Sequence, residues 1–248
     1  MLLLQPVLIA LLLGIVADNQ VFEIYESTKS ILFALSCAGI WIGLFNSIQE
    51  ICKERVVLKR EYMGNLKLWS YTLSKFLIQM LVGVFQAAIM TVVFQLVIGM
   101  PEKGILLENS FPEIFLTIWL TITASMALGF IISAIVKSGD KAMTFAPFVL
   151  IIQLLFSGIL FELKGTGSRI AYMTISKWSV ESLGSIADLN DLTMKMQEEI
   201  PGLTHEFQDI FEAAKGHLLG HWAVLAGMIV LCGIVTTLLL RNVAKDGR

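Results

Sequence analysis

Residues 76–100 read FLIQMLVGVFQAAIMTVVFQLVIGM, a run of 25 residues without a single Asp, Glu, Lys or Arg. A helix needs about 20 apolar residues to cross the roughly 30 Å of hydrocarbon in a bilayer, so this run is long enough for one transmembrane helix. A strand of a membrane β-barrel would instead show about ten residues of alternating polarity. The run therefore predicts an all-α integral membrane protein.

Five further windows also lack these four charged residue types, and they have 16, 19, 23, 20 and 23 residues: 2–17, 30–48, 114–136, 142–161 and 218–240. The first is marginal in length, but it lacks the basic start and the A-x-A cleavage pattern of a signal peptide, so we interpret it as a membrane helix. Because it starts at residue 2, we expect more sequence in front of it or a partner chain that supplies it. The prediction is six transmembrane helices, the third starting near residue 70, in one domain over residues 1–248.

The composition of the 248 residues agrees with this prediction. Hydrophobic residues make up 56% of the chain and charged residues 15%, and the mean hydropathy is +0.77. Average soluble domains have about 25% charged residues. A soluble enzyme, a disordered chain and a nucleic-acid-binding protein are therefore excluded.

The charged residues divide unequally between the two sides of the membrane. Six spans put both termini on one side, and the loops of that side hold 11 of the 18 basic and 5 of the 20 acidic residues: 49–75, 137–141 and 241–248. The opposite loops hold the rest, which gives net charges of +6 and -8: 18–29, 101–113 and 162–217. The positive-inside rule makes the first side, with both termini, cytoplasmic. This surface suits anionic lipid headgroups or an acidic protein.

Two loops are long enough to have structure of their own. Residues 50–64 mix charges of both signs and contain no Pro or Gly before Gly64, so they predict a short helix along the inner membrane surface. In the external loop, residues 168–187 around Trp178 predict a segment that re-enters the interface. The following acidic part, 188–216, predicts a helix capped by Thr204 with four apolar residues on one face: Phe207, Ile210, Phe211 and Ala214.

Sequence motifs of catalysis are mostly absent. The chain has no G-x-x-x-x-G-K-[ST] phosphate loop, no G-x-S-x-G elbow and no H-E-x-x-H helix. The six windows also lack the charged side chains that mark ion-coupled transport. His217 and His221 are spaced for a metal, but histidines beside Trp222 in an aromatic belt are the simpler explanation, and we predict no metal. Three dispersed cysteines indicate no disulfide framework.

The cytoplasmic helix carries a more specific signal. The octapeptide Glu54-Arg55-Val56-Val57-Leu58-Lys59-Arg60-Glu61, followed by Gly64 and Ser70-Tyr71-Thr72-Leu73-Ser74-Lys75, resembles the E-R-x-x-x-x-R-E … Y-x-x-(S/A)-K signature of type-2 permease domains of ATP-binding cassette (ABC) exporters, especially the G subfamily. Phe156-Ser157-Gly158-Ile159-Leu160 and Lys177-Trp178-Ser179 resemble the end of the fifth helix and the re-entrant external segment of that family. The order of loop lengths is also similar. Bacterial members that fuse a phosphopeptide-recognising domain and an ATPase ahead of the permease look closest.

This resemblance implies an ATP-driven exporter in which two permease units surround a central cavity and work by alternating access. ATP and Mg would bind a fused or separate nucleotide-binding domain, so this chain would not be an enzyme by itself. The family's coupling role would fall on six residues of the cytoplasmic helix: Glu50, Glu54, Arg55, Lys59, Arg60 and Glu61. Its cavity positions would fall on Gly39, Ile42, Pro147, Ile151 and Leu154, and its exit plug on Ile159 and Leu160.

The aliphatic character of these cavity positions implies a hydrophobic or amphipathic substrate, although helix packing or lipid contact explains each of them equally. The external loop has no cysteine pair and the chain has no N-x-[ST] sequon, which favours a bacterial inner membrane. Gly39-x-x-x-Gly43 predicts close helix packing within the subunit, or else a face at a subunit interface or cavity.

Two other functional classes stay open at this stage. The apolar face Phe207-Ile210-Phe211 motivates a membrane scaffold or receptor whose acidic external loop binds a partner. His217 and His221 motivate a membrane enzyme.

Overall fold

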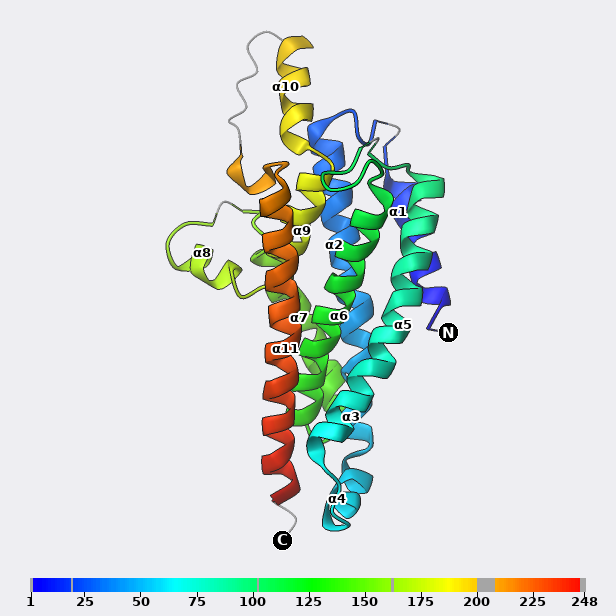
Figure 1. The fold of residues 1–248 in the computed structure, drawn as a ribbon, viewed down its shortest axis with the longest axis vertical. Coiled ribbons are helices and arrows are strands. Elements are labelled where there is room, and N and C mark those ends of the chain that lie inside the picture. The colour runs from blue at the N-terminus through cyan, green and yellow to red at the C-terminus, as the bar shows by residue number, and fades with distance from the viewer. Residues whose placement is uncertain (1, 19, 102, 162, 200–207, 246–248) are drawn as a thin grey trace.

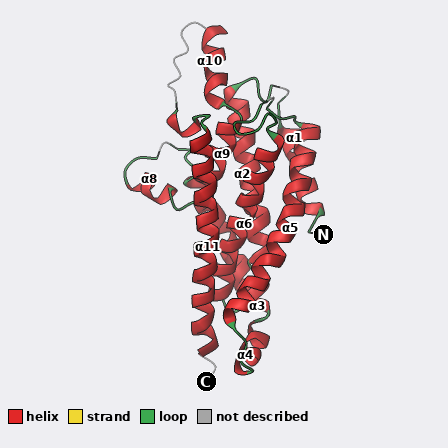
Figure 2. Cartoon of the chain, viewed as in Figure 1, coloured by secondary structure: helices red, strands yellow, loops and turns green. Residues whose placement is uncertain are grey.

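The computed structural model describes residues 2–18, 20–101, 103–161, 163–199 and 208–245. The chain is a bundle of helices, and these described ranges contain no strand (Figure 2). The predicted all-α class is therefore confirmed. In chain order the helices are α1 (Leu4–Val16), α2 (Tyr25–Ser47), α3 (Glu50–Lys53), α4 (Arg55–Met63), α5 (Leu68–Val97), α6 (Phe111–Ile135), α7 (Gly139–Leu155), α8 (Thr166–Ala171), α9 (Ile175–Ile186), α10 (Leu189–Glu199), the 3-10 turn η1 (Asp209–Phe211) and α11 (Lys215–Lys245).

Four described segments are long and apolar enough to cross a membrane, and they cover most of four predicted windows: Tyr25–Lys53, Leu68–Val97, Phe111–Ile135 and Lys215–Arg241. The other two predicted spans are shorter helices. Helix α1 has 13 residues, which is about 20 Å of helix, and α7 has 17 residues, about 26 Å. Helix α7 ends at Leu155, six residues before the predicted end at 161, because Gly158 follows with a φ of +82°. The structure thus supports four spans by length, and the count of six stays a prediction.

The centre of the bundle is the pair α2 and α6, which run side by side along most of their length (Figure 1). Gly43 lies so close to α6 that a Cβ there would overlap the carbonyl oxygen of Ile122. Gly129 of α6 lies equally close to the side chain of Ser47. Small residues of this kind let two backbones approach. The Gly39-x-x-x-Gly43 pair therefore serves packing within the subunit.

The remaining helices surround this pair. Helices α5 and α11 pack on α6, and α1 packs on α5 in the upper half of Figure 1. The start of α1 is fixed to the middle of α5, because the Nε2 of the buried Gln86 donates a hydrogen bond to the carbonyl oxygen of Leu2 at 2.9 Å.

The segment predicted to re-enter the interface forms α8 and α9. Helix α9 packs against α2, α6 and α11, and ten of its twelve residues are buried. Thr121 of α6 donates a hydrogen bond to the hydroxyl of Ser179 at 2.8 Å, and the indole of Trp222 donates to Thr117 at 2.9 Å. The first bond joins α9 to α6 and the second joins α11 to α6, so α9 lies within the bundle, while its depth in a membrane stays a prediction.

The beginning of the helix predicted from Thr204 lies outside the described residues. From residue 208 onward the described chain has the turn η1 over Asp209–Phe211 before α11 begins at Lys215. Phe211 is fully buried and packs against Gly184, Val180 and Leu189. Thr204 and Phe207 lie outside the described residues.

Candidate coupling site

The cytoplasmic end of α2 leads into the predicted coupling segment, which the structure divides into two helices. Helix α3 is a single turn, and α4 begins at Arg55. Glu54 separates them with a backbone conformation (φ -94°, ψ 5°) that is not helical. Helix α4 ends at Gly64, and Asn65 follows with a positive φ of 76° that turns the chain toward α5. The single helix predicted over 50–64 is therefore two helices joined at Glu54.

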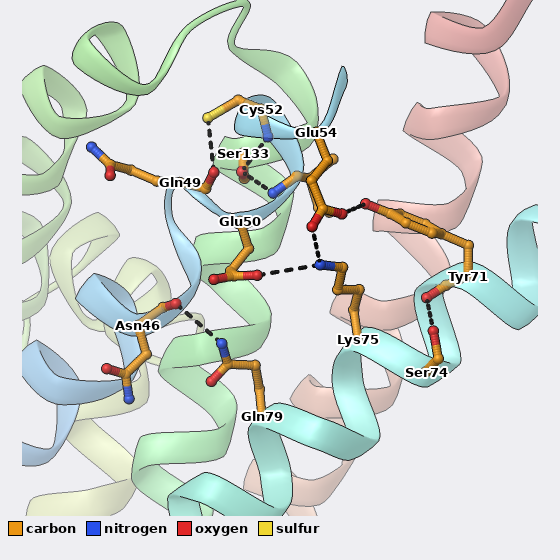
Figure 3. A network of polar contacts seen from close by, with 11 residues as sticks. Asn46, Gln49, Glu50, Cys52, Glu54, Tyr71, Ser74, Lys75, Gln79 and Ser133 are labelled. Carbon is orange, nitrogen blue, oxygen red and sulfur yellow. Dashed lines mark hydrogen bonds and ion pairs between the residues drawn. The ribbon is translucent and has the colours of Figure 1, made fainter. Parts of the chain in front are cut away.

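A small ionic network holds this junction to the start of α5 (Figure 3). The Nζ of Lys75 lies 2.7 Å from Oε1 of Glu54 and 3.4 Å from Oε2 of Glu50. The hydroxyl of Tyr71 donates a hydrogen bond to the other carboxylate oxygen of Glu54 at 3.0 Å. Tyr71 and Lys75 are four residues apart on α5, so they lie on one face of that helix.

The network is a partly exposed ion pair reinforced by a hydrogen bond. An exposed pair contributes only about 0–1 kcal/mol, because water screens the charges and two long side chains lose freedom. The Lys75 side chain is 20% exposed, whereas Glu54 is 44% and Glu50 38% exposed, so water screens the pair in part; the Glu54 carboxylate also accepts from the Tyr71 phenol. Charge-assisted hydrogen bonds of this kind are about twice as strong as neutral ones. The network therefore fixes the junction to α5.

A second contact runs from the junction to the end of α6. The guanidinium of Arg55 donates a hydrogen bond to the carbonyl oxygen of Val136 at 2.8 Å, just beyond the last turn of α6. Backbone carbonyls at a helix end have no partner within the helix, and a cation there is favourable. The junction is therefore tied to two membrane helices, α5 and α6.

The rest of the coupling segment faces outward. Arg60 and Glu61 are exposed and Lys59 is half-buried. Two apolar residues of α4 accompany them, with Val56 82% and Met63 74% exposed. Leu58 is 1% exposed and belongs to the same core cluster as residues of α5, α6 and α11. The six predicted coupling residues thus divide into three that hold the junction (Glu50, Glu54 and Arg55) and three on the free face (Lys59, Arg60 and Glu61).

The predicted cavity positions lie in two different environments. Gly39 and Ile42 are buried on α2, and Gly39 contacts Thr121 and Ile122 of α6. Pro147 and Ile151 are exposed on α7, and Leu154 is half-buried. Of the predicted plug, Ile159 is half-buried and Leu160 is exposed. The two groups thus differ in exposure within the chain, and their role in an assembly stays a prediction.

The sequence reasoning missed several buried polar contacts. Lys177 and Glu181 of α9 form an ion pair, and Nε2 of His221 lies 3.7 Å from the same carboxylate. Their spacing of four residues on a helix is the one available sequence signal. Within α2 and α5, Asn46 donates a hydrogen bond to Gln86 at 2.6 Å, and Gln79 donates to the Asn46 carbonyl at 3.3 Å. Asn46, Gln79 and Gln86 carry no charge, so the charge pattern of the sequence does not indicate these contacts.

The histidines do not gather metal ligands. Among the residues that the structure describes, no group of three or more His, Cys, Asp or Glu side chains could hold a metal ion. The His217 and His221 rings are tilted against each other at 4.2 Å between ring centroids, and Trp178 lies edge-on to His221 at 5.3 Å. The ring contact of His221 is therefore with Trp178 of α9, whereas the prediction named Trp222.

Comparison with known proteins decides the family. The family model described as ABC-2 type transporter matches residues 1–186. The chain belongs to this family. Its similarity to permease domains of ABC transporters, inferred above from the Glu54–Glu61 octapeptide, is therefore confirmed.

One relative resembles the chain over much of its length. The ABC transporter ATP-binding/permease protein Rv1747 of Mycobacterium tuberculosis is 26% identical over 174 residues. The match covers 69% of this chain and 20% of the relative, so the chain spans about a fifth of that protein. The relative's name joins ATP binding and permease activity in one chain. ABC-2 membrane domains are the permease component, and ATP hydrolysis belongs to a nucleotide-binding domain.

Proposed function

We propose that this chain is the transmembrane permease of an ATP-driven exporter, in which two permease units are coupled to nucleotide-binding domains. The observation that carries the proposal is the two-sided coupling segment. Its inner side is fixed to α5 and α6, while its outer side presents Arg60, Glu61, Val56 and Met63 to solvent. A segment attached in this way can transmit a movement of a soluble domain to the membrane helices.

The free face of α4 suits a protein partner. An apolar patch with a charged rim is the usual composition of a protein interface. Arg60 and Glu61 offer both signs of charge around Val56 and Met63. A nucleotide-binding domain, fused or separate, would dock here and would carry the ATP and Mg that this chain has no motif to bind.

A second permease unit completes the proposed transporter. Helix α7 leaves apolar side chains exposed along its length: Phe145, Phe148, Ile151, Ile152 and Leu155. Counting α1 and α7 as short spans gives six crossings with both termini in the cytoplasm; for α1 this count rests on the sequence pattern, because α1 covers only part of the bundle and begins beside the middle of α5. We place it in a bacterial inner membrane.

The apolar α7 face and the aliphatic positions Ile151 and Leu154 favour a hydrophobic or amphipathic substrate moved by alternating access.

No second function is proposed. The receptor alternative rested on an apolar face that includes Phe211, and this residue packs inside the fold. The enzyme alternative rested on His217 and His221, which pack against each other and against Trp178.

The test compares coupling in matched variants. The permease and its nucleotide-binding domain are reconstituted in liposomes of phosphatidylethanolamine and phosphatidylglycerol, and ATP hydrolysis is compared with that of the nucleotide-binding domain alone. We expect Lys75→Glu to remove most of the difference, because it places like charges opposite Glu50 and Glu54. The double variant Glu54→Lys with Lys75→Glu restores one opposite-charge pair and should recover part of the coupling. Lys67→Glu, at an exposed lysine before α5, is the control.

Two results would count against the proposal. The first is ATP hydrolysis that does not respond to the permease at all. The second is equal loss of coupling in Lys75→Glu and Lys67→Glu, because this would show a general effect of charge at the inner surface.

A further inference from the structure

The first turn of the coupling segment has an unusual partner. The backbone N–H groups at the start of a helix have no acceptor within that helix, and a side chain just before the helix normally supplies one. In α3 the preceding residue is Gln49, and it makes no such bond. The N–H groups of Ile51 and Cys52 instead donate to one oxygen, the Oγ of Ser133 in α6, each at 3.0 Å (Figure 3).

A serine hydroxyl suits this position because its oxygen has two lone pairs and can accept two hydrogen bonds. Ile51 and Cys52 are the second and third residues of α3, which are the positions that an N-cap side chain usually satisfies. Ser133 therefore caps α3 from another helix, 81 residues away in the sequence.

The surroundings make this bond an effective mechanical link. Ser133 is fully buried, and Ile51 and Cys52 are buried as well, so water does not compete for the donors. Ser133 lies on α6 one turn after Gly129, where α6 is in closest contact with Ser47 of α2. Ser133 therefore belongs to the part of α6 that packs closely on α2.

Two neighbouring bonds extend the link toward α7. Arg55 donates to the carbonyl of Val136, and Nε2 of Gln49 donates to the carbonyl of Gly139 at 3.2 Å. Gly139 is the first residue of α7, the helix that carries three of the predicted cavity positions. The contacts of Gln49 and Arg55, on either side of α3, therefore lead to the α6–α7 connection, whereas Lys75 leads to α5.

We propose that Ser133 is a positioning residue for coupling: it caps α3 across the helix interface and transmits movement of the coupling segment to α6 and the start of α7. This inference rests on the proposed function, because it assigns a route within that transporter. Ser133 was not among the residues that the sequence indicated, and a serine inside an apolar window gives no signal of its own.

The test separates the local bond from its effect on coupling. Ser133→Ala removes the acceptor without adding volume, and the pair Ser133→Thr and Ser133→Val has nearly equal shapes with and without a hydroxyl. Ser125→Ala is the control, since Ser125 is also buried on α6 and donates across to the Ile40 carbonyl at 2.6 Å, far from α3. Each variant is prepared as the full chain with its nucleotide-binding domain.

Two quantities are measured. Hydrogen exchange at the Ile51 and Cys52 amides should become about fivefold faster in the Ala and Val variants, as for the loss of one typical N-cap. Stimulation of ATP hydrolysis in liposomes should fall at least twofold in the same variants. Ser133→Thr should retain both properties, and Ser125→Ala should change neither.

The inference is overturned if exchange at these amides is unchanged in Ser133→Ala, or if exchange rises while coupling stays at the wild-type level. The Ala variant gives the answer if Thr and Val fail to fold. Failure of the proposed function gives a different result. In that case Lys75→Glu, like the Ser133 variants, leaves ATP hydrolysis unchanged.

Discussion

Single residues at the α2–α6 contact set how closely the two central helices approach. Gly43 meets the backbone of α6 at Ile122, and Gly129 meets Ser47 of α2. In hydrocarbon the hydrophobic effect does not drive helices together, so close packing and hydrogen bonds between them supply the attraction. The bond from the Ser125 hydroxyl to the Ile40 carbonyl lies in the same interface. Loss of one glycine here should therefore disturb the whole bundle.

We expect Gly43→Ala to lower the free energy of unfolding by about 1–3 kcal/mol or more, because the added Cβ overlaps backbone that cannot rotate away. Gly227→Ala in α11 is the matched control, since nothing lies within 4 Å of its Cβ position. That change should be neutral or slightly stabilising. Thermal unfolding of both variants in detergent measures the difference, and equal melting temperatures would contradict the packing argument.

Glu113 is buried, although the sequence predicts it among the charges of an external loop. The residue is 1% exposed. Its carboxylate accepts the backbone N–H groups of Ile105, Leu106 and Leu107 at 2.7–2.9 Å. The net charge of -8 assigned to the external side therefore includes at least one carboxylate that organises a loop instead of facing solvent.

At the scale of elements, the long apolar helices were predictable and the coupling segment was only partly so. Hydropathy over 20 residues is a local property, which is why 30–48, 76–100, 114–136 and 218–240 all fall largely within long helices. The break at Glu54 depends on contacts with Lys75, Tyr71 and Ser133, which are distant in sequence. No pattern within 50–64 encodes those contacts. The division of the six coupling residues between the two faces also depends on these distant contacts, so the sequence did not predict it.

Helix α9 carries the buried ion pair Lys177–Glu181, and burial acts on the pKa of its acid. Burial raises the pKa of Glu181 above its ordinary value of 4.5, and the hydrogen bond from Lys177 opposes this rise without cancelling it. The folded state therefore binds a proton at Glu181 more tightly than the unfolded state does. By linkage, the contribution of Glu181 to stability falls as the pH rises above about 4.5 toward the raised pKa.

Glu181→Gln should remove this pH dependence. We expect the melting temperature of the variant, relative to wild type, to rise as the pH increases from about 4.5 to 7. Thermal unfolding at several pH values measures the trend. Glu212→Gln, at an exposed carboxylate near the start of α11, should show no such trend. A constant difference between Glu181→Gln and wild type would mean that the pKa of Glu181 is the same in both states.

At the scale of the whole molecule, the two ends of the bundle have different characters. One end carries α3, α4 and the basic loops, and the other carries α10, η1 and the loop around Glu113 (Figure 1). The short loops follow the charge division predicted from the sequence, because the chain around 49–67 and 137–141 lies at one end of the bundle and 20–24 and 103–110 lie at the other. The long loop does not lie at one end, since α8 lies beside the bundle and α9 packs within it (Figure 1). Which end faces the cytoplasm is a prediction from the positive-inside rule.

Cysteine labelling tests this orientation. After Cys37, Cys52 and Cys232 are replaced by Ala, single cysteines are placed at the exposed positions Met194 and Arg60. A membrane-impermeant maleimide should label Met194→Cys in intact cells. It should label Arg60→Cys only after the cells are made permeable. The reverse pattern would mean an inverted topology.

The junction at Glu54 is held to α5 by the ion pairs of Lys75 and to α6 by uncharged bonds to Ser133 among other contacts, and dissolved salt acts on these two kinds of contact differently. The screening length of water falls from about 10 Å at 0.1 M salt to about 3 Å at 1 M. The Glu54 side chain is 44% exposed, so its attraction to Lys75 weakens with added salt. The buried bonds to Ser133 carry no net charge and are shielded from the ions. Rising ionic strength therefore loosens the junction from α5 while it stays attached to α6.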